Sequence, residues 1–386
     1  MKVERLVKTR IWLLLVGLIL IGLAASGCTT LGTQPKGWAG GEVTDGRLFF
    51  GSGKGEVIAL DASDGSRVWE AALESEKSEG GFGCTPVSAT VVIYGTPVVA
   101  GDSVYVGAYN GIVYAVNAST GEARKFYPEE GELEAVIGGL LAGSGKLYFG
   151  SVDGAVYALD VTTRDTVWRF PTGGKIWSTP VIDGDTLYVG SFDKKLYALN
   201  ADDGSKRWEP FATEGAIVAA PAVYNNSIYF GSLDRHVYAL DAATGALKWR
   251  FPAEKWFWTK IVAFNNLIYA PCLDGKVYVL NAETGAKVTE FDLGSPVSSS
   301  PVLVENLVIV ATEEGRVYSL DTTNQKQRLL ANVAELADEA LLIRSPLFAS
   351  EGIVFVHAQT EKHGSLLYAL DAVTGIDLWR YPVSSK

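Results

Sequence analysis

Residues that could carry out chemistry are scarce in this sequence and lie far apart. The chain of 386 residues has three cysteines and three histidines. They are Cys28, Cys84 and Cys272, and His236, His357 and His363. The histidines lack the spacing to a second ligand or base that is typical of a metal site or a catalytic triad. We interpret Cys84 and Cys272 as isolated thiols, because three cysteines cannot form a disulfide framework.

Asn200, Asp202 and Asp203 form a cluster of side-chain oxygens whose spacing is faintly similar to that of a calcium loop. Such loops place oxygen ligands at alternate positions and close with a bidentate glutamate. The closing glutamate is missing here, and Gly204 follows directly, as in an ordinary Asp-Gly turn. We therefore interpret this group as a turn and predict no metal site.

Two tryptophans and a lysine are better candidates for a binding site. Trp177 and Trp258 occur just before short apolar segments, and Lys260 follows the second of them by two residues. Aromatic side chains beside an ammonium group suit a small anion or a peptide. The alternative is that these side chains only fill a crowded part of the core. The choice depends on the elements that position them.

These elements repeat about every 41 residues. The eight copies of the motif are ALDASDG at 59–65, AVNASTG at 115–121, ALDVTTR at 158–164, ALNADDG at 198–204, ALDAATG at 239–245, VLNAETG at 279–285, SLDTTNQ at 319–325 and ALDAVTG at 369–375. Each copy contains four short apolar segments joined by turns, and so short a period leaves no room for helices. The sequence therefore predicts an all-β fold, an eight-bladed β-propeller of four-stranded antiparallel blades.

Large aromatic residues recur at fixed places in the repeat. Tyrosine recurs on the second and third predicted strands. Tryptophan recurs on the fourth, four residues after a turn glycine or its equivalent: Trp69, Trp168, Trp208, Trp249 and Trp379. We expect these rings to fill the wedge between blades and to face glycines such as Gly150, Gly190 and Gly231.

The repeat places the candidate binding residues at the entrance of the innermost strand of each blade. Eleven residues before the aromatic of the second strand, the sequence has Trp38, Tyr94, Ile137, Trp177, Val218, Trp258 and Ser298. Two positions later, Lys260 replaces a small or hydroxyl residue, and Ile261 replaces the usual proline. We expect these positions to converge at one mouth of the central channel.

The pattern Ala-x-Asp-x-x-Thr-Gly-x-x-x-Trp is complete at 239–249 and resembles the PQQ-like repeat. That family includes eight-bladed quinoprotein dehydrogenases and the BamB-type lipoprotein of the outer-membrane β-barrel assembly machinery. The resemblance covers residues 38–384 and implies the propeller fold. The dehydrogenases hold their quinone with an adjacent Cys-Cys disulfide and with acidic calcium ligands in long inserted loops. This sequence has no Cys-Cys pair and only two insertions, at about 71–93 and 325–343.

We therefore predict that the chain is not an enzyme and has no cofactor. PQQ as a cofactor is implied by the family resemblance only, and by no residue pattern of this sequence. Two alternatives stay open: a PQQ-dependent or PQQ-binding quinoprotein, and a propeller that senses a ligand in the cell envelope. A red-shifted absorbance on adding the quinone with calcium would favour the first.

Residues 1–27 have the pattern of a secretory signal peptide, with basic residues, then an apolar run, then small residues. The segment Ala25-Ser26-Gly27-Cys28 resembles a bacterial lipobox, which implies that Cys28 is acylated and becomes the first residue after cleavage. Residues 28–37 then comprise the lipidated cysteine and a polar linker, and residues 38–386 form the propeller.

The net charge of −11 argues against nucleic acid as a partner. We expect a lipid-anchored envelope propeller that acts as a scaffold for other envelope proteins. The resemblance implies a BamB-like part in a β-barrel assembly complex. Thr29 and Thr30 stand where a retention signal for the inner membrane would have Asp. This implies the periplasmic side of the outer membrane if the cell has one, and otherwise the extracytoplasmic face.

Overall fold

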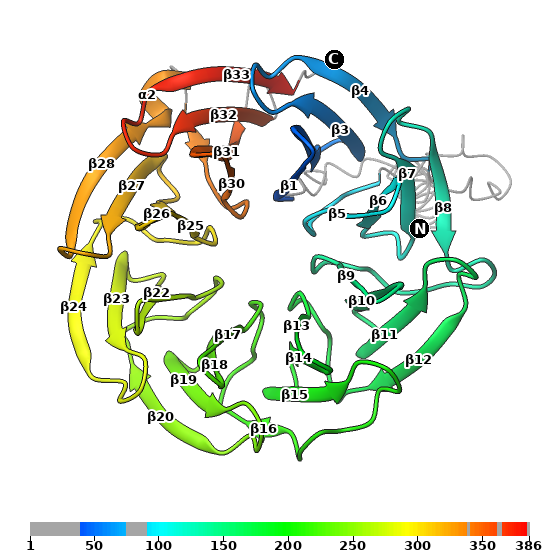
Figure 1. The fold of residues 1–386 in the computed structure, drawn as a ribbon, viewed down its shortest axis with the longest axis horizontal. Helices are drawn as coiled ribbons and strands as arrows, with labels where there is room; N and C mark the ends of the chain where they lie inside the picture. The colour runs from blue at the N-terminus through cyan, green and yellow to red at the C-terminus, as the bar shows by residue number, and fades with distance from the viewer. Residues whose placement is uncertain (1–38, 75–90, 338–339, 361–364, 384–386) are drawn as a thin grey trace, which may run out of the picture. The chain divides into compact units, whose positions relative to one another are not determined.

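The computed structural model describes residues 39–74, 91–337, 340–360 and 365–383, which form eight antiparallel sheets around a central axis (Figure 1). Strands that follow one another along the chain pair within one sheet, and the sheets follow chain order around the axis. The innermost strand of each blade faces the axis, and the last strand forms the outer surface (Figure 1). The predicted eight-bladed propeller is confirmed.

The first four blades have four strands each. Blade 1 contains β1 (Gly41–Thr44), β2 (Arg47–Gly51), β3 (Glu56–Asp61) and β4 (Arg67–Ala72). Blade 2 contains β5 (Val98–Ala100), β6 (Ser103–Gly107), β7 (Val113–Asn117) and β8 (Ala123–Tyr127). Blade 3 contains β9 (Leu141–Gly143), β10 (Lys146–Gly150), β11 (Ala155–Asp160) and β12 (Thr166–Pro171). Blade 4 contains β13 (Val181–Asp183), β14 (Thr186–Gly190), β15 (Lys195–Asn200) and β16 (Phe211–Ala212).

The last four blades include two departures from the repeat. Blade 5 contains β17 (Ala222–Tyr224), β18 (Ser227–Gly231), β19 (His236–Asp241) and β20 (Leu247–Pro252). Blade 6 contains β21 (Val262–Phe264), β22 (Leu267–Pro271), β23 (Lys276–Asn281) and β24 (Lys287–Asp292). Blade 7 contains β25 (Val302–Val304), β26 (Leu307–Ala311), β27 (Arg316–Asp321) and β28 (Lys326–Asn332), and the short helix α2 (Val333–Ala337) follows it. Blade 8 contains β29 (Leu341–Leu342), β30 (Phe348–Ser350), β31 (Ile353–Thr360), β32 (Ser365–Asp371) and β33 (Asp377–Val383).

Both departures lie near the second predicted insertion. β29 and β30 both pair with β31, so blade 8 has five strands where the repeat predicts four. The helix α2 occurs where the repeat left no room for one, because the inserted residues lengthen the connection between blades 7 and 8. Within the described ranges, no helix has the length and apolar character needed to cross a membrane.

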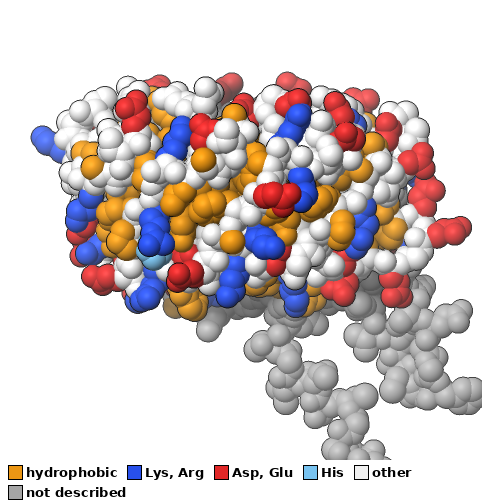
Figure 2. Space-filling view, turned by 90° about the horizontal axis from the view of Figure 1, so that it is seen from below, with side chains coloured by type: hydrophobic (Ala, Val, Ile, Leu, Met, Phe, Trp, Pro, Cys, Tyr) orange, Lys and Arg blue, Asp and Glu red, His pale blue; other side chains and the backbone are white. Residues whose placement is uncertain are grey.

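The middle strands are buried on both faces, because each blade is covered by a neighbour on either side. β14 and β15 are almost completely buried along their length. The outer strand β20 instead buries Trp249 and exposes the residues on either side of it. Apolar side chains such as Val167 and Val288 are 43% and 52% exposed on the outer strands. Figure 2 shows a band of apolar side chains between charged ones on this outer surface.

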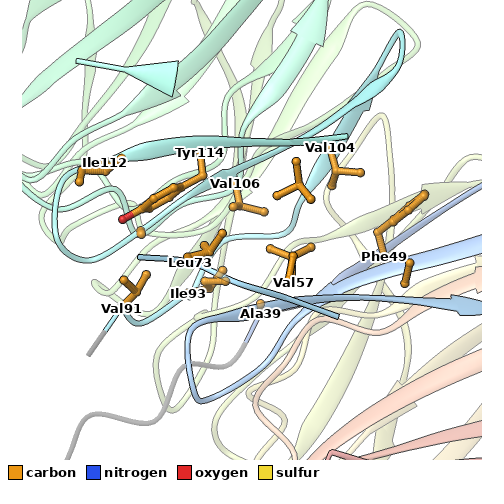
Figure 3. Packing of buried hydrophobic residues seen from close by; sticks show 14 of the residues in the cluster. Ala39, Phe49, Val57, Leu73, Val91, Ile93, Val104, Val106, Ile112 and Tyr114 are labelled. Atoms are coloured by element: carbon orange, nitrogen blue, oxygen red, sulfur yellow. The ribbon is translucent and has the colours of Figure 1, made fainter. Parts of the chain in front are cut away.

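The core is therefore divided into layers between neighbouring blades. In the layer shown in Figure 3, Phe49 and Val57 of blade 1 pack against Val104, Val106 and Tyr114 of blade 2. Similar clusters join blades 3 and 4 and blades 4 and 5. Stability thus depends on eight interfaces of similar design rather than on one central core.

The hairpin turns follow the sequence closely. Gly111, Gly154, Gly275 and Gly315, which were predicted to supply a positive φ between the second and third strands, have φ values of 77°, 81°, 90° and 94°. Glycine reaches this left-handed region without the steric cost that a Cβ brings. The prediction for these turns is confirmed.

The recurring tryptophans lie between blades, but they face other glycines than we expected. A Cβ on Gly204, Gly245 or Gly285 would lie 2.6–2.7 Å from the indole Cδ2 of the preceding blade's tryptophan. Gly150 and Gly190 instead face Ile176 and Ile217 at the start of the next blade. The predicted pairing was wrong because the tryptophan lies at the outer edge of the blade, beside the neighbour's last turn.

Trp208 also departs from the prediction, since it precedes the outer strand of blade 4 instead of lying in it. Pro210 has no N–H group to donate to β15, so regular pairing is limited to Phe211 and Ala212. A single bridge joins Leu199 to Lys206 upstream of the proline. Trp208 still reaches the next blade, where its Nε1 donates to the Ala242 carbonyl at 3.3 Å.

The ring closes by packing rather than by a shared strand. Blade 1 contains strands from the N-terminal part of the described chain only, and blade 8 contains C-terminal strands only. Leu48 and Phe50 of blade 1 pack against Phe355 and Leu367 of blade 8. Trp379 Nε1 donates to the Ala62 carbonyl of blade 1 at 3.2 Å, as the other tryptophans do to their neighbours.

Candidate functional site

A cavity of about 900 Å³ lies on the axis of the ring, where the entrances of all eight innermost strands meet. Trp177, Trp258 and Lys260, which we expected to converge, all line it. Residues at the same repeat position in other blades line it too: Tyr94, Ile137, Val218 and Ser298. Trp38 lies outside the described residues. The repeat thus brings a set of sequence-distant side chains to one place.

Trp177 and Trp258 are in contact although blade 5 separates their blades in the chain. Their ring centroids are 6.2 Å apart with an interplanar angle of 77°. Trp177 also meets Phe192 edge to face, with centroids 4.7 Å apart. Blade 5 allows this contact because it has Val218, a smaller residue, at the equivalent position. Trp177 and Trp258 form an aromatic wall on one side of the channel, and Phe192 packs against Trp177 without lining the cavity.

Lys260 projects into the channel from a ring of small residues. The equivalent residues in the other blades are Gly40, Thr96, Gly139, Thr179, Ala220, Ser300 and Pro346. The backbone of this ring is held by hydroxyl groups, since Lys260 N donates to Ser300 Oγ at 3.2 Å and Gly139 N donates to Thr179 Oγ1 at 2.8 Å. The Lys260 side chain is exposed to the channel, but the surrounding wall lowers the pKa of its ammonium group by desolvation.

Arg344 is a channel residue that the sequence reasoning missed. It lies eleven residues before Phe355, just as Trp177 and Trp258 lie eleven residues before the aromatic residue of their second strand. It also lines the same cavity. Its Nε is 3.4 Å from Oε1 of Glu313, and its side chain is 46% exposed. The eleven-residue spacing could have found it. The insertion before blade 8 and His357 in place of the usual glycine hid the repeat there.

Glu42 adds an acidic group to the channel wall. It lies on β1, is half-buried, and burial raises the pKa of its carboxyl group. Among the described residues, neither Glu42 nor Lys260 has a side-chain hydrogen bond or an ion pair. The channel therefore offers an aromatic wall, a desolvated ammonium group and a guanidinium, which are groups that bind an anion.

The cysteines and histidines do not contribute to this site. Cys84 and His363 lie outside the described residues, as does Cys28. Cys272 is buried, its thiol donates to the carbonyls of Lys255 and Trp256, and burial raises its pKa to about 12. It thus replaces the serine of other blades as a hydrogen-bond donor and is a poor nucleophile.

His357 and His236 lie apart from the channel cavity as well. His357 is buried between blades 8 and 1, with Nδ1 3.1 Å from Ser345 Oγ and 3.0 Å from the Ala39 carbonyl. His236 is half-buried, and its Nδ1 is 3.1 Å from the Asp234 carbonyl. The cluster of side-chain oxygens near residue 200 forms turns, as predicted: Asn200 accepts from Asp202 N, and Asp203 accepts from Ser205 N.

The channel fits a quinone only in part. The indole rings could contact a flat ring system, and Lys260 could face an anionic substituent on it. Calcium, however, needs several oxygen ligands, and the described part of the chain holds no group of three or more His, Cys, Asp or Glu residues that could bind a metal ion. The described residues therefore do not supply the calcium ligands that the PQQ-like repeat implies.

A second depression is lined by residues of blades 5 to 7 and of the connections between them. Trp256, Leu273 and Pro296 provide its apolar part, and it has a volume of about 730 Å³. Its charged residues are Arg235, Glu254, Lys255 and Glu313. Trp256 is 50% exposed, whereas the equivalent residue is alanine in blades 3 and 5. We call this depression the Trp256 groove. The sequence reasoning missed it because the residue type at this repeat position changes from blade to blade.

Comparisons with known proteins agree with this fold. A model of the family described as "Beta-alanine-activating enzyme, beta-propeller" matches residues 88–375. No curated protein sequence gives a match. Among solved structures, BamB from Moraxella catarrhalis is similar with a TM-score of 0.67 and 21% identity over 83% of this chain and 91% of that one. The computationally designed Ika8 protein has a TM-score of 0.69 and 16% identity over 88% of this chain and 98% of its own.

Both solved structures support the propeller fold, and one of them is a BamB. The family model covers well over half of the sequence, from the strands of blade 2 to the last turn of blade 8. This chain therefore belongs to the beta-propeller family of the beta-alanine-activating enzyme.

Proposed function

We propose that this chain is an exported, lipid-anchored propeller that acts as a scaffold for proteins of the cell envelope and has no catalytic activity of its own. The BamB-like fold supports a place in an outer-membrane β-barrel assembly complex. The family description names an enzyme, and we propose that this chain shares its propeller alone. Repeated hairpins account for most of the described residues, and a ring of eight interlocked blades is a rigid support for variable loops.

The observation that carries this proposal is the Trp256 groove. A half-exposed tryptophan beside leucine and proline costs free energy in water and gains it when a partner covers it. Tryptophan is enriched among the residues that dominate binding at protein interfaces. Charges of both signs at the edge of the groove, such as Lys255 and Glu313, would add specificity of orientation.

The membrane anchor is the second part of the proposal, and it concerns residues outside the described ranges. Acylation of Cys28 would attach the chain to a membrane, and residues 28–37 would hold the propeller away from the lipid surface. Several acyl chains on one residue give stable anchoring, because each buried methylene contributes about 0.8 kcal/mol. Changing Cys28→Ser should move the protein from the membrane fraction to the soluble fraction.

The scaffold role is tested by cross-linking in native membranes followed by purification of this chain. We expect an outer-membrane assembly barrel protein to be recovered with the natural chain and lost with Trp256→Ser. The matched control is Leu378→Ser, since Leu378 is 46% exposed on the outer strand β33 and lies outside the groove. Failure to recover such a barrel protein with the natural chain would overturn the proposal, as would equal recovery with Trp256→Ser.

A further inference from the structure

Lys260 is the residue in the channel that the fold itself does not explain. Every other blade has a glycine, alanine, proline, serine or threonine at this position, so the ring of strand entrances closes without a long side chain. An ammonium group in a confined wall loses hydration, and this cost is recovered only when an anion or acceptor pairs with it. Among the described residues, no carboxylate is within ion-pair distance of Lys260. The ammonium group is therefore open to an anion that enters the channel from outside the described chain.

The aromatic wall indicates what the anion is attached to. Trp258 lies two residues before Lys260 on the same strand entrance, and Trp177 meets it with ring centroids 6.2 Å apart. An apolar or aromatic group placed against these rings would lie close to the ammonium group. Arg344, from blade 8, adds a second positive charge to the same cavity. The ligand is thus an anion that carries an apolar group.

The backbone of the channel favours a polypeptide over a free small acid. Each innermost strand, such as β13, β17 or β21, pairs with one neighbour only, so its other edge faces the axis. The N–H and C=O groups on such an edge can bind an extended chain through main-chain hydrogen bonds. A cavity of about 900 Å³ has room for a chain end of several atoms beyond a single side chain.

We propose that the channel mouth binds the C-terminal end of a partner polypeptide, with Lys260 paired to the terminal carboxylate and Trp177 and Trp258 against an apolar last side chain. This inference rests on the proposed scaffold function and names a second point of contact for a protein partner. It differs from the Trp256 groove in what it recognises. The Trp256 groove binds a folded surface or a loop of a partner, and the channel binds a chain end.

The test uses the purified full chain and a short acetylated peptide that ends in phenylalanine, prepared with a free carboxylate and as the amide. Calorimetry and tryptophan fluorescence give the affinities. We expect the free acid to bind at least tenfold more tightly than the amide. In Lys260→Met this preference should disappear, so that the two peptides bind alike, whereas Trp258→Ala should weaken both forms by a similar factor. Loss of the acid preference in Lys260→Met alone identifies the carboxylate's partner.

The control variant is Lys175→Met, because Lys175 is an exposed lysine two residues before Trp177 and is not among the residues lining the cavity. It should keep the preference for the free acid. Lys260→Met is expected to fold, since it removes a desolvated charge from a wall of small residues. Absence of binding by the free-acid peptide, or a preference that survives in Lys260→Met, would overturn the proposal.

A small acid with the same end, phenylpropionate, distinguishes the two sources of the carboxylate. If it binds as tightly as the peptide, the channel is a site for free small acids and the proposed occupant is wrong. Weaker binding by tenfold or more supports a chain end. Because these measurements need no envelope partner, they succeed or fail independently of the barrel recovery that tests the Trp256 groove.

Discussion

Five of the eight interfaces between neighbouring blades are closed by a tryptophan, and three are not. The tryptophans are Trp69, Trp168, Trp208, Trp249 and Trp379, which join blades 1 to 2, 3 to 4, 4 to 5, 5 to 6 and 8 to 1. At the same distance from the turn, blades 2, 6 and 7 have Lys125, Thr289 and Leu329. In blades 2 and 7 the register shift lies between other residues, and the buried side chains of the outer strand are Phe126 and Leu330. The comparison shows which parts of the repeat depend on one another.

In three of the interfaces with tryptophan, the tryptophan and a tyrosine donate to one carbonyl of the next blade. Trp249 Nε1 donates to the Ala282 carbonyl at 2.9 Å, and the Tyr229 hydroxyl donates to the same oxygen at 3.1 Å. Both lone pairs of the oxygen are thus used. The indole covers Gly285, where a Cβ would lie 2.6 Å from Cδ2 of the ring. Carbonyl, ring and glycine form one unit that spans two blades.

In two interfaces without tryptophan the glycine is absent as well. Arg164 and Gln325 occupy the glycine position with φ values of 68° and 56°, close to those of the glycines. Gln325 Nε2 donates to the Tyr269 hydroxyl at 3.2 Å, so its side chain takes part of the space that an indole would fill. In the third interface without tryptophan, between blades 7 and 8, Gly375 lies against the Leu330 backbone. A Cβ added to Gly375 would be 2.1 Å from the Leu330 carbonyl oxygen. Glycine is therefore needed at this turn for close approach, and positive φ alone does not require it.

The largest effect expected from this comparison is the loss of a tryptophan. Trp249→Ala removes a side chain that is 8% exposed and leaves a cavity between blades 5 and 6, so the free energy of unfolding should fall by about 3–5 kcal/mol. Leu329→Ala, at the same distance from the turn in blade 7, should cost less than about 1 kcal/mol because Leu329 is 50% exposed. Urea unfolding followed by circular dichroism measures both. Equal losses would mean that the two kinds of interface do not differ in stability.

Most of this architecture could be predicted from the sequence because its signals are local. The period of the motif gave the number of blades, and Asn110-Gly111 or Asp153-Gly154 predicted hairpin turns that the φ values confirm. The tryptophan positions followed from their fixed distance to the turn. Each of these signals spans a few residues and depends on backbone geometry, which repeats when the sequence does.

The contacts between blades could not be predicted in the same way. The partner of Trp249 is 33 residues away at Ala282, and nothing in the local sequence distinguishes Gly285 from Gly231 as its neighbour. The channel was predicted in part: the repeat brought Trp177 and Trp258 into contact, but Arg344 was missed. The Trp256 groove depends on a loop position at which the residue type changes from blade to blade. Variable positions carry the candidate sites, and periodicity says least about them.

The second effect in size concerns the glycine beneath the ring. Gly285→Ala places a methyl group at φ of 70° and against the Trp249 indole, so it should destabilise the chain by about 2 kcal/mol, of which roughly 1–2 kcal/mol is the backbone term. In a Trp249→Ala background the same change should cost only the backbone term. A double-mutant cycle measures the difference. Strict additivity of the two changes would show that ring and glycine are energetically independent.

The third test concerns the interface that closes the ring, where His357 occupies the glycine position of the second strand. Burial lowers the pKa of this imidazole below its ordinary value of 6.5, so the folded chain takes up its proton later than the unfolded chain. Stability should therefore fall as the pH drops below about 6.5, by up to about 1.4 kcal/mol for each pH unit from this group.

His357→Gln removes the titrating group, and its difference from the natural chain is followed by urea unfolding across this pH range. The variant should lose less stability than the natural chain on going from pH 8 to pH 5. Parallel curves for the two proteins would show that ring closure does not depend on the protonation of His357.

The smallest effect is expected at an interface without tryptophan, and its sign is informative. Arg164→Gly relieves a left-handed φ of 68°, a gain of roughly 1–2 kcal/mol, and costs roughly 0.5–1 kcal/mol in chain entropy. It also removes an exposed ion pair with Glu129, in which the nitrogen and oxygen are 3.6 Å apart, worth at most about 1 kcal/mol. The net change in unfolding free energy should lie within about 1 kcal/mol of zero. A glycine at position 164, between blades 2 and 3, would thus leave the free energy of unfolding nearly unchanged, whereas replacing Gly285 lowers it. If Arg164→Gly instead destabilised the chain as much as Gly285→Ala does, contacts other than an indole ring would determine which residue the turn needs. The distinction between interfaces with and without tryptophan would then fail.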